Sequence, residues 1–115
     1  MATYTKKLLS ESTSGGAISV AATSTAGTLI HTAVAGAAAW DEIWLYASNN
    51  NAAATKLTIE WGDPDVDDKI ELTIAGEAGL VLVAPGLLMN GGLFVKAFAA
   101  TTEYITIHGY VNAIT

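Results

Sequence analysis

The chain has 115 residues, of which 51% are hydrophobic and only 14% are charged. Five basic against eleven acidic residues give a net charge of −6, which leaves few cations for the phosphate contacts that dominate nucleic-acid affinity, so we expect no nucleic-acid partner. The absence of cysteine excludes disulfides and thiolate metal sites, and the high hydrophobic fraction indicates that other subunits cover part of the surface.

The first sixteen residues differ in composition from the rest. Residues 1–10 lack the apolar core of a secretion signal, and residues 10–16 are polar and glycine-rich, which predicts a flexible loop. Residues 3–9 are expected to form either an edge strand or a tail that reaches a neighbouring subunit. We therefore expect residues 1–16 to form an amino-terminal arm and loop, and residues 17–115 to form one domain.

The next segments of the chain predict three strands. Residues 17–21 and 28–33 are short strand candidates, and residues 40–47 form a longer one rich in aromatic and branched side chains. In this longer strand both faces carry apolar surface, so we expect a central position in a sheet. One face carries Ile43, Leu45 and Ala47, and the other carries Trp44 and Tyr46.

Residues 56–61 and 69–74 alternate apolar and polar side chains around the acidic turn 62–68, which predicts a β-hairpin with one face in a core. The side chains expected in the core are Leu57, Ile59 and Trp61, with Ile70, Leu72 and Ile74 on the returning strand. The side chains expected in water are Lys56, Thr58 and Glu60, with Lys69, Glu71 and Thr73 opposite. A slip of one residue would invert all of them, so the register is firmly specified.

Three more strands are predicted at residues 80–83, 93–99 and 103–114. The last places Ile105, Ile107 and Val111 on one face and Tyr104, Thr106, His108 and Tyr110 on the other. About eight short strands at regular spacing predict an all-β fold, an antiparallel β-sandwich that is jelly-roll-like. The longest apolar run, residues 78–89, contains Gly and Pro and is too short to cross a bilayer, so we expect no membrane contact.

The acidic turn is the candidate metal site. Asp63, Asp65 and Asp67 alternate along it, and carboxylate oxygens at this spacing could hold Ca²⁺. An EF-hand loop would need Gly and Glu where this chain has Asp68 and Ile74, so that motif fails. The alternative is a solvated hairpin tip that discourages edge pairing, and we expect no cofactor beyond a possible Ca²⁺.

No pattern in the chain predicts catalysis. His31 and His108 are the only histidines, and neither lies next to a nucleophile motif, so we interpret both as structural or surface residues. Asp41 and Glu42 are adjacent on a strand and therefore point to opposite faces, which prevents them from acting as an acid and base pair. We expect the protein not to be an enzyme.

An aromatic set on two predicted strands has three interpretations. Its side chains could stack on sugar rings, form the buried centre of a subunit contact, or fill the core of the sandwich. The set comprises Trp44, Tyr46, Tyr104, His108 and Tyr110.

Four segments carry a resemblance to a known class of proteins. They are residues 39–49 (AWDEIWLYASN), 57–62 (LTIEWG), 79–86 (GLVLVAPG) and 107–112 (IHGYVN). In these segments and their order, from about residue 28 to the end, the chain resembles small virion structural proteins of tailed bacteriophages, of the capsid decoration or head-associated kind.

The resemblance implies a β-sandwich that assembles, often as a homotrimer, on a lattice of major capsid protein and cements it. It implies a place on the capsid surface of the virion, after synthesis in the host cytoplasm, and no active-site residues. We expect the subunit contacts to include Lys6 and Leu8 of the arm and the aromatic set. Two alternatives remain open, a carbohydrate-binding module that uses Trp44, Tyr46 or Tyr110, and a tail or fibre component.

Overall fold

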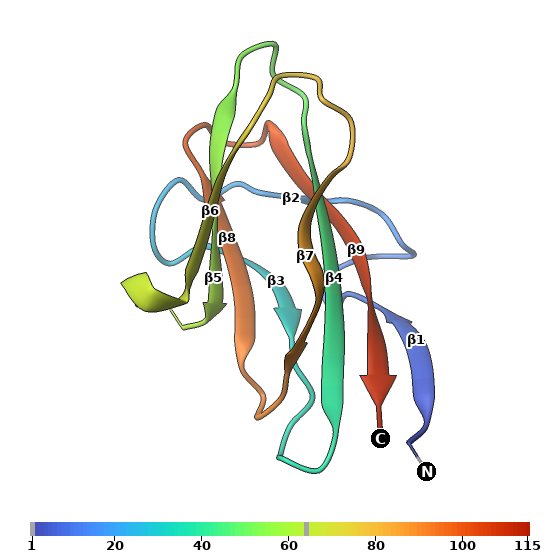
Figure 1. Ribbon diagram of the computed structural model, residues 1–115. Coiled ribbons are helices and arrows are strands. Elements are labelled where there is room, and N and C mark those ends of the chain that lie inside the picture. Colours follow the sequence, from blue (N-terminus) through green and yellow to red (C-terminus); the bar gives the residue numbers. More distant parts are fainter. Residues whose placement is uncertain (1, 64) are drawn as a thin grey trace.

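A computed structural model describes residues 2–63 and 65–115 of the chain. Their regular structure consists of nine β-strands and one single-turn 3₁₀ helix, η1 (Figure 1). The strands are β1 (Tyr4–Leu8), β2 (Ile18–Ser19), β3 (Thr28–Thr32), β4 (Trp40–Asn49), β5 (Thr55–Gly62), β6 (Lys69–Ile74), β7 (Val81–Met89), β8 (Phe94–Ala99) and β9 (Ile105–Ile114), and η1 spans Val66–Asp68. None of the helical structure in the described residues is long and apolar enough to span a membrane.

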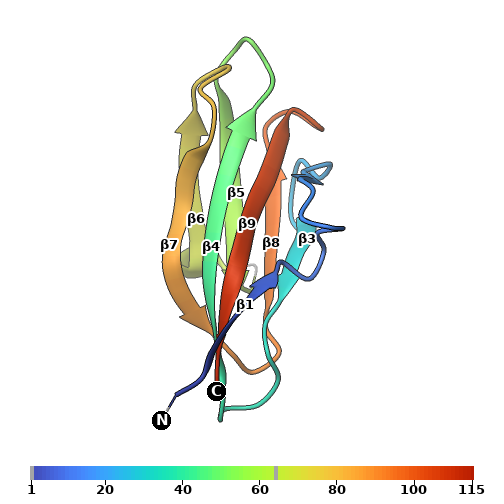
Figure 2. The same cartoon turned by 90° about the vertical axis from the view of Figure 1, so that its right-hand side faces the viewer.

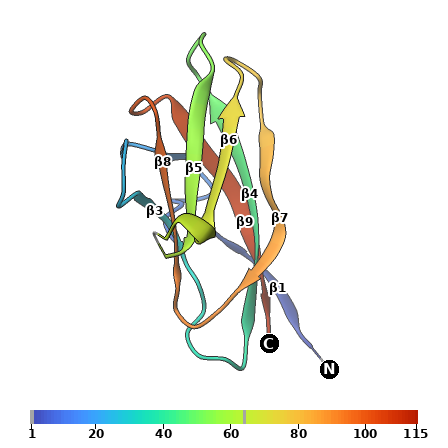
Figure 3. The same cartoon turned by 60° about the vertical axis from the view of Figure 1, so that its left-hand side comes forward.

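The strands form two antiparallel sheets that pack face to face, so the predicted β-sandwich is confirmed. One sheet has the order β1-β9-β4-β7, with the short β2 also paired to β9 (Figure 2). The other has the order β3-β8-β5-β6 (Figure 3). With β2 set aside, the pairs are nested as in a rolled-up ribbon, since β5 pairs with β6, β4 with β7, β3 with β8 and β1 with β9. This is the predicted jelly-roll arrangement.

The core lies between the two sheets and follows the alternation of the sequence. The inward positions of β4 and β9 carry Ile43, Leu45, Ile105 and Ile107, all fully buried. Each such side chain contributes roughly 1.5–3 kcal/mol through burial. The expected central position of the 40–47 strand is also confirmed, because β4 lies between β9 and β7.

The amino-terminal segment is attached to the sandwich. Of the two alternatives for residues 3–9, the structure shows the edge strand, because β1 pairs with β9 from Tyr4–Ile114 to Leu8–Tyr110. Leu9 then enters the core and is buried. The arm set apart in the sequence thus contacts the rest of the domain through a sheet ladder and a core side chain.

The β5–β6 hairpin has the predicted register, with Leu57 opposite Leu72 and Ile59 opposite Ile70. Two expectations about it are wrong, since Thr58 and Glu60 were both expected in water and are both buried, with Thr58 only 3% exposed and Glu60 only 2% exposed. Glu60 Oε1 accepts a hydrogen bond from the Gly27 amide at 2.6 Å, and Glu60 Oε2 accepts one from Thr25 Oγ1 at 3.0 Å. The loop between β2 and β3 therefore covers the four-stranded sheet at Glu60.

Candidate functional site

The outward side chains of the five-stranded sheet form a surface that we call the aromatic face. On β4 and β9 strand alternation places them there, because the opposite positions of these two strands are mostly buried. On β1 and β7 the pairing with these strands places them there. Directly paired residues share a side of the sheet, and Trp44 pairs with Tyr110 while Tyr46 pairs with His108. The face comprises Lys6 and Leu8 of β1, His108, Tyr110 and Asn112 of β9, Glu42, Trp44 and Tyr46 of β4, and Leu82, Pro85 and Leu88 of β7.

Trp44 and Tyr110 form the centre of this face. Their ring centroids are 6.1 Å apart and the ring planes are within 12° of parallel. Lys6 Nζ lies over the Tyr110 ring, 4.9 Å from its centroid, which adds a cation–π contact. The indole of Trp44 also lies against Gly86 of β7, where a Cβ atom would come within 2.8 Å of the indole Cζ2. Glycine at this position therefore lets the indole approach the sheet closely.

Glu42 fixes the orientation of the indole. Its Oε1 accepts hydrogen bonds from Trp44 Nε1 at 2.8 Å and from Asn112 Nδ2 at 2.9 Å. These bonds, that of Asn112 first and that of Trp44 second, lower the pKa of the Glu42 carboxyl below its ordinary value of 4.5. Because both donors favour the charged form, Glu42 is a carboxylate at neutral pH.

Apolar side chains surround this centre. Leu8, Leu82 and Leu88 are each about half exposed. The residues of the face carry one formal positive charge, on Lys6, and one formal negative charge, on Glu42, although the whole chain carries −6. The aromatic face is therefore a nearly uncharged apolar surface on a strongly acidic protein.

The structure brings together six of the seven residues expected at an interface, and Tyr104 is the exception. Tyr104 precedes β9 in a turn at the end of the sheet, where its backbone oxygen accepts a hydrogen bond from the Asn50 amide at 2.9 Å. The interpretation that the aromatic set fills the core is wrong, because Trp44, Tyr46 and Tyr110 lie on the side of the sheet that faces away from it.

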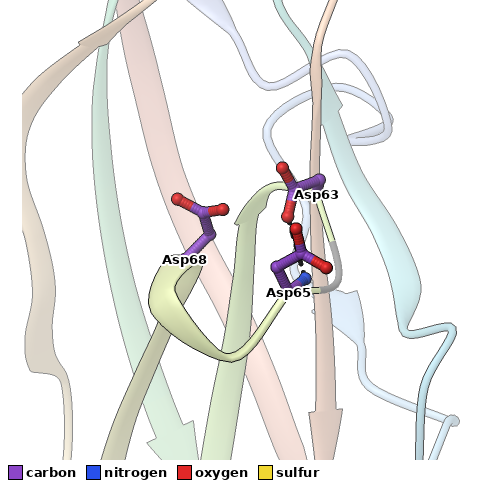
Figure 4. A group of neighbouring side chains, drawn as sticks. All are labelled: Asp63, Asp65 and Asp68. Atoms are coloured by element: carbon purple, nitrogen blue, oxygen red, sulfur yellow. Dashed lines mark hydrogen bonds between the residues drawn. The ribbon is translucent and has the colours of Figure 1, made fainter.

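The acidic turn brings together a set that differs from the expected one. Carboxylate oxygens of Asp63, Asp65 and Asp68 lie within 4.8 Å of one another, and Asp67 is not part of this group (Figure 4). The turn of η1 brings Asp68 rather than Asp67 back toward Asp63. A hydrogen bond with Asp63, and then the Asp63 charge, raise the pKa of Asp68 above its ordinary value of 3.8. All three side chains are exposed, as expected for a solvated hairpin tip.

A buried ionisable pair joins the two sheets, and the sequence analysis did not find it. His31 of β3 and Asp41 of β4 are 2.8 Å apart between Nε2 and Oδ2. The Val34 amide donates to the same Oδ2 at 3.1 Å, and the Ser10 amide donates to His31 Nδ1 at 3.0 Å. The sequence pattern of β4 could have indicated this pair, because Asp41 is in phase with the core positions Ile43 and Leu45. A carboxylate that faces a core requires a partner.

Ser10, His31 and Asp41 do not have the geometry of a nucleophilic triad. In such a triad the serine hydroxyl is hydrogen-bonded to the histidine. Here the backbone amide of Ser10 reaches the imidazole, while its Oγ accepts a hydrogen bond from the Thr32 amide at 2.7 Å. The network connects the segment after β1 to β3 and β4.

Comparisons of the chain with protein-family models, with curated proteins and with solved structures found no match. The function is therefore inferred from the chemistry of the chain's own surfaces. The aromatic face is an exposed apolar surface, and the acidic turn brings together three carboxylates, those of Asp63, Asp65 and Asp68.

Proposed function

We propose that the protein is a non-enzymatic structural protein of a tailed-bacteriophage virion, a capsid decoration protein that assembles through its aromatic face. The observation that carries the proposal is the wide, nearly uncharged apolar surface of the five-stranded sheet. Jelly rolls include viral capsid domains and lectin domains. The fold alone does not decide between such functions, so the support comes from the surface and from the resemblance of the sequence to virion proteins.

The composition of the aromatic face supports a role as a protein interface. Tyr and Trp are enriched and charged residues are depleted in the central part of protein–protein interfaces. Trp44 and Tyr110 are held in one arrangement by Glu42, Lys6 and Gly86, so little side-chain entropy is lost when a partner covers them. The half-exposed leucines around them enlarge the apolar area, as at surfaces that bind partners.

The occupant that we propose for this face is a second copy of the chain. Two molecules with a net charge of −6 repel each other, and an approach through the aromatic face brings together surfaces that are neutral overall. Lys6 and Glu42 also give the face one charge of each sign for contacts between copies. Self-contact would give a twofold dimer, whereas the homotrimer implied by the resemblance would place this face against a different surface of the neighbour. The major capsid protein is the proposed partner of the assembled oligomer.

The test is the oligomeric state of a charged variant. Leu82→Lys combined with Leu88→Lys adds two cations at half-exposed positions of the aromatic face. We expect the unaltered protein to sediment as an oligomer and the double variant to sediment as a monomer. Val66→Lys is the matched control, because Val66 is 77% exposed and lies in η1, beside the other sheet.

The control variant should sediment like the unaltered protein, and the thermal unfolding of all three proteins should be similar. An unaltered protein that remains a monomer at every concentration would contradict the proposal. Electron cryo-microscopy of the native particle tests the location, and we expect density for this chain on the outer surface of the capsid. Density confined to the tail or a fibre would favour the alternative location.

Carbohydrate binding is the second candidate function, and the geometry of Trp44 favours it. The indole is held in place beside the polar groups of Glu42 and Asn112, a combination that suits a sugar ring. The contact of Lys6 with the Tyr110 ring occupies one of the aromatic surfaces that a sugar would use. Binding on a glycan array that is lost in Trp44→Ala would support this candidate, and an array without hits would exclude the glycans tested.

A further inference from the structure

A cavity of about 290 Å³ opens where the end of β1 approaches β3 and β4, and Leu8 at the edge of the aromatic face forms part of its lining. Figure 2 shows β1 and β3 on the same side of the molecule, beside β9. The walls of the cavity are mostly apolar and include Val34, Ala39, Val111 and Ala113. The polar groups that line it belong to Lys7, Ser10, His31, Thr32, Asp41 and Thr115.

Hydrogen bonding determines the protonation of His31 at this cavity. The Ser10 amide is a donor, so His31 Nδ1 must present a lone pair to it. The proton of the neutral imidazole is then on Nε2, which donates to Asp41 Oδ2. His31 therefore gives Asp41 a hydrogen bond without a positive charge.

Asp41 is consequently a nearly buried carboxylate without a countercharge. Its side chain is 9% exposed, and among the described residues the only basic side chain in contact with it is the neutral imidazole of His31. The hydrogen bonds to the Asp41 side chain, from His31 and the Val34 amide, both end on Oδ2. Among the described residues, Thr55 Oγ1 is the only buried side-chain polar atom without a hydrogen-bond partner, so Asp41 Oδ1 is not fully buried, and Asp41 lines the cavity.

We propose that this cavity binds a primary ammonium group carried on an apolar chain. The ammonium donates to Asp41 Oδ1 and supplies the missing positive charge, because a buried charge is costly unless it is paired. The hydroxyl oxygens of Ser10 and Thr32 offer further acceptors, and the apolar walls contact the hydrocarbon part of the ligand. This site shares Leu8 with the proposed assembly surface, and its other lining residues lie outside that surface.

The donor set favours an ammonium group over other cations. Ca²⁺ prefers six to eight oxygen ligands, and the cavity offers a single aspartate. A guanidinium binds best to a carboxylate through both oxygens, and Oδ2 of Asp41 already accepts two hydrogen bonds. An ammonium is a compact point charge that needs only the one free oxygen.

The ammonium group that enters the cavity has two possible sources. One is a free alkylamine, and the other is the lysine side chain of a second protein molecule. The five basic residues of the chain are all lysines, so a second copy could supply only an ammonium. Lys7 lines the cavity itself, and its Nζ is not ion-paired with Asp41.

The test is an NMR titration of the full chain with butylammonium, using butanol and butyrate as neutral and anionic probes of similar size. We expect saturable shifts of the Val111 and Val34 methyl signals with butylammonium, and at least about tenfold weaker binding of both other probes. Equal shifts with butanol would show an apolar cavity without a role for the charge and would overturn the proposal, as would no shift with butylammonium.

Two variants complete the test. Asp41→Asn keeps the shape and removes the charge, and we expect binding to weaken at least about tenfold. Ala39→Leu adds side-chain volume to the lining of the cavity and keeps the Asp41 carboxylate, so it keeps the test decisive if Asp41→Asn does not fold. We expect it to abolish binding, and unchanged binding by a folded Ala39→Leu would overturn the proposal.

Sedimentation distinguishes the two sources. If a lysine of a second copy occupies the cavity, butylammonium should dissociate the oligomer, and if a free amine occupies it, butylammonium should leave the oligomer intact. Leu82→Lys with Leu88→Lys should still bind butylammonium in either case, because neither leucine lines the cavity. Failure of assembly through the aromatic face is therefore distinguishable from failure of this site.

Discussion

The indole of Trp44 lies within 12° of parallel to the ring of Tyr110, with 6.1 Å between their centroids. The two residues are paired across β4 and β9, and the indole extends over Gly86 on the neighbouring strand. Three strands therefore cooperate to hold one aromatic surface. Changes to any of them should disturb it in ways that can be measured.

Gly86→Ala should destabilise the fold and displace the indole. Gly86 has φ = +77°, and an added Cβ would collide with the Trp44 ring. Gly79→Ala is the matched control, because Gly79 also has φ = +77° but no atom within 4 Å of the added Cβ. We expect a loss of about 1–2 kcal/mol for Gly79→Ala from backbone strain alone, and a larger loss with altered near-ultraviolet circular dichroism for Gly86→Ala. Equal effects of both substitutions would contradict the close contact with Trp44.

Acid should release the Trp44 indole from Glu42. The folded state lowers the pKa of Glu42 through the hydrogen bonds of Asn112 and Trp44, so this contribution to stability is fully present above the unfolded pKa. It is lost as the pH falls through the lowered pKa of the folded state. The Trp44 Nε1–H NMR signal should therefore titrate at a pH below 4.5. In Asn112→Ala the midpoint should move upward, and an unchanged midpoint would rule out the role of Asn112.

Glu60→Ala should loosen the loop between β2 and β3. The substitution removes the acceptors of Thr25 Oγ1 and the Gly27 amide, which costs about 1–3 kcal/mol when the donors remain away from water. Hydrogen exchange should show faster exchange of the Gly27 amide. Glu71→Ala is the control, because Glu71 is exposed and pairs with Lys56 at the surface, and it should leave Gly27 protected.

Two adjacent leucines should differ sharply in their contribution to stability. Leu9→Ala removes a buried side chain and should cost about 2–5 kcal/mol in chemical denaturation. Leu8→Ala changes a half-exposed side chain and should stay within about 0.5 kcal/mol. Deletion of residues 1–12 removes both β1 and Leu9 and should therefore destabilise the domain. Equal effects of the two substitutions would mean that Leu9 is not part of the core.

The sequence predicted the sandwich because short strand patterns recur along the chain, and β4, β8 and most of β9 alternate between buried and less buried residues. The same alternation correctly separated Ile43 and Leu45 from Trp44 and Tyr46, which was sufficient to identify the centre of the aromatic face. The contributions of Leu82 and Leu88 were not predicted, because the register between β4 and β7 shifts twice and residues 80–83 are apolar at every position, so that alternation assigns no face to them.

Two buried carboxylates show where alternation was insufficient. Glu60 occupies an outward position and is buried by a loop distant in sequence, which no local pattern indicates. His31 reaches Asp41 because a register irregularity in β3 leaves both Ile30 and His31 buried. The acidic turn was assigned Asp67 instead of Asp68 because an extended strand pattern was assumed where the chain forms η1.

Cross-linking through a single introduced cysteine tests most directly whether the aromatic face contacts another copy. The chain has no cysteine, so Leu82→Cys places one thiol on this face and Val66→Cys places one in η1. With a short bifunctional maleimide at a concentration where the protein is an oligomer, we expect Leu82→Cys to form covalent dimers rapidly and Val66→Cys to remain monomeric. Dimers that form from Val66→Cys and not from Leu82→Cys would contradict assembly through the aromatic face.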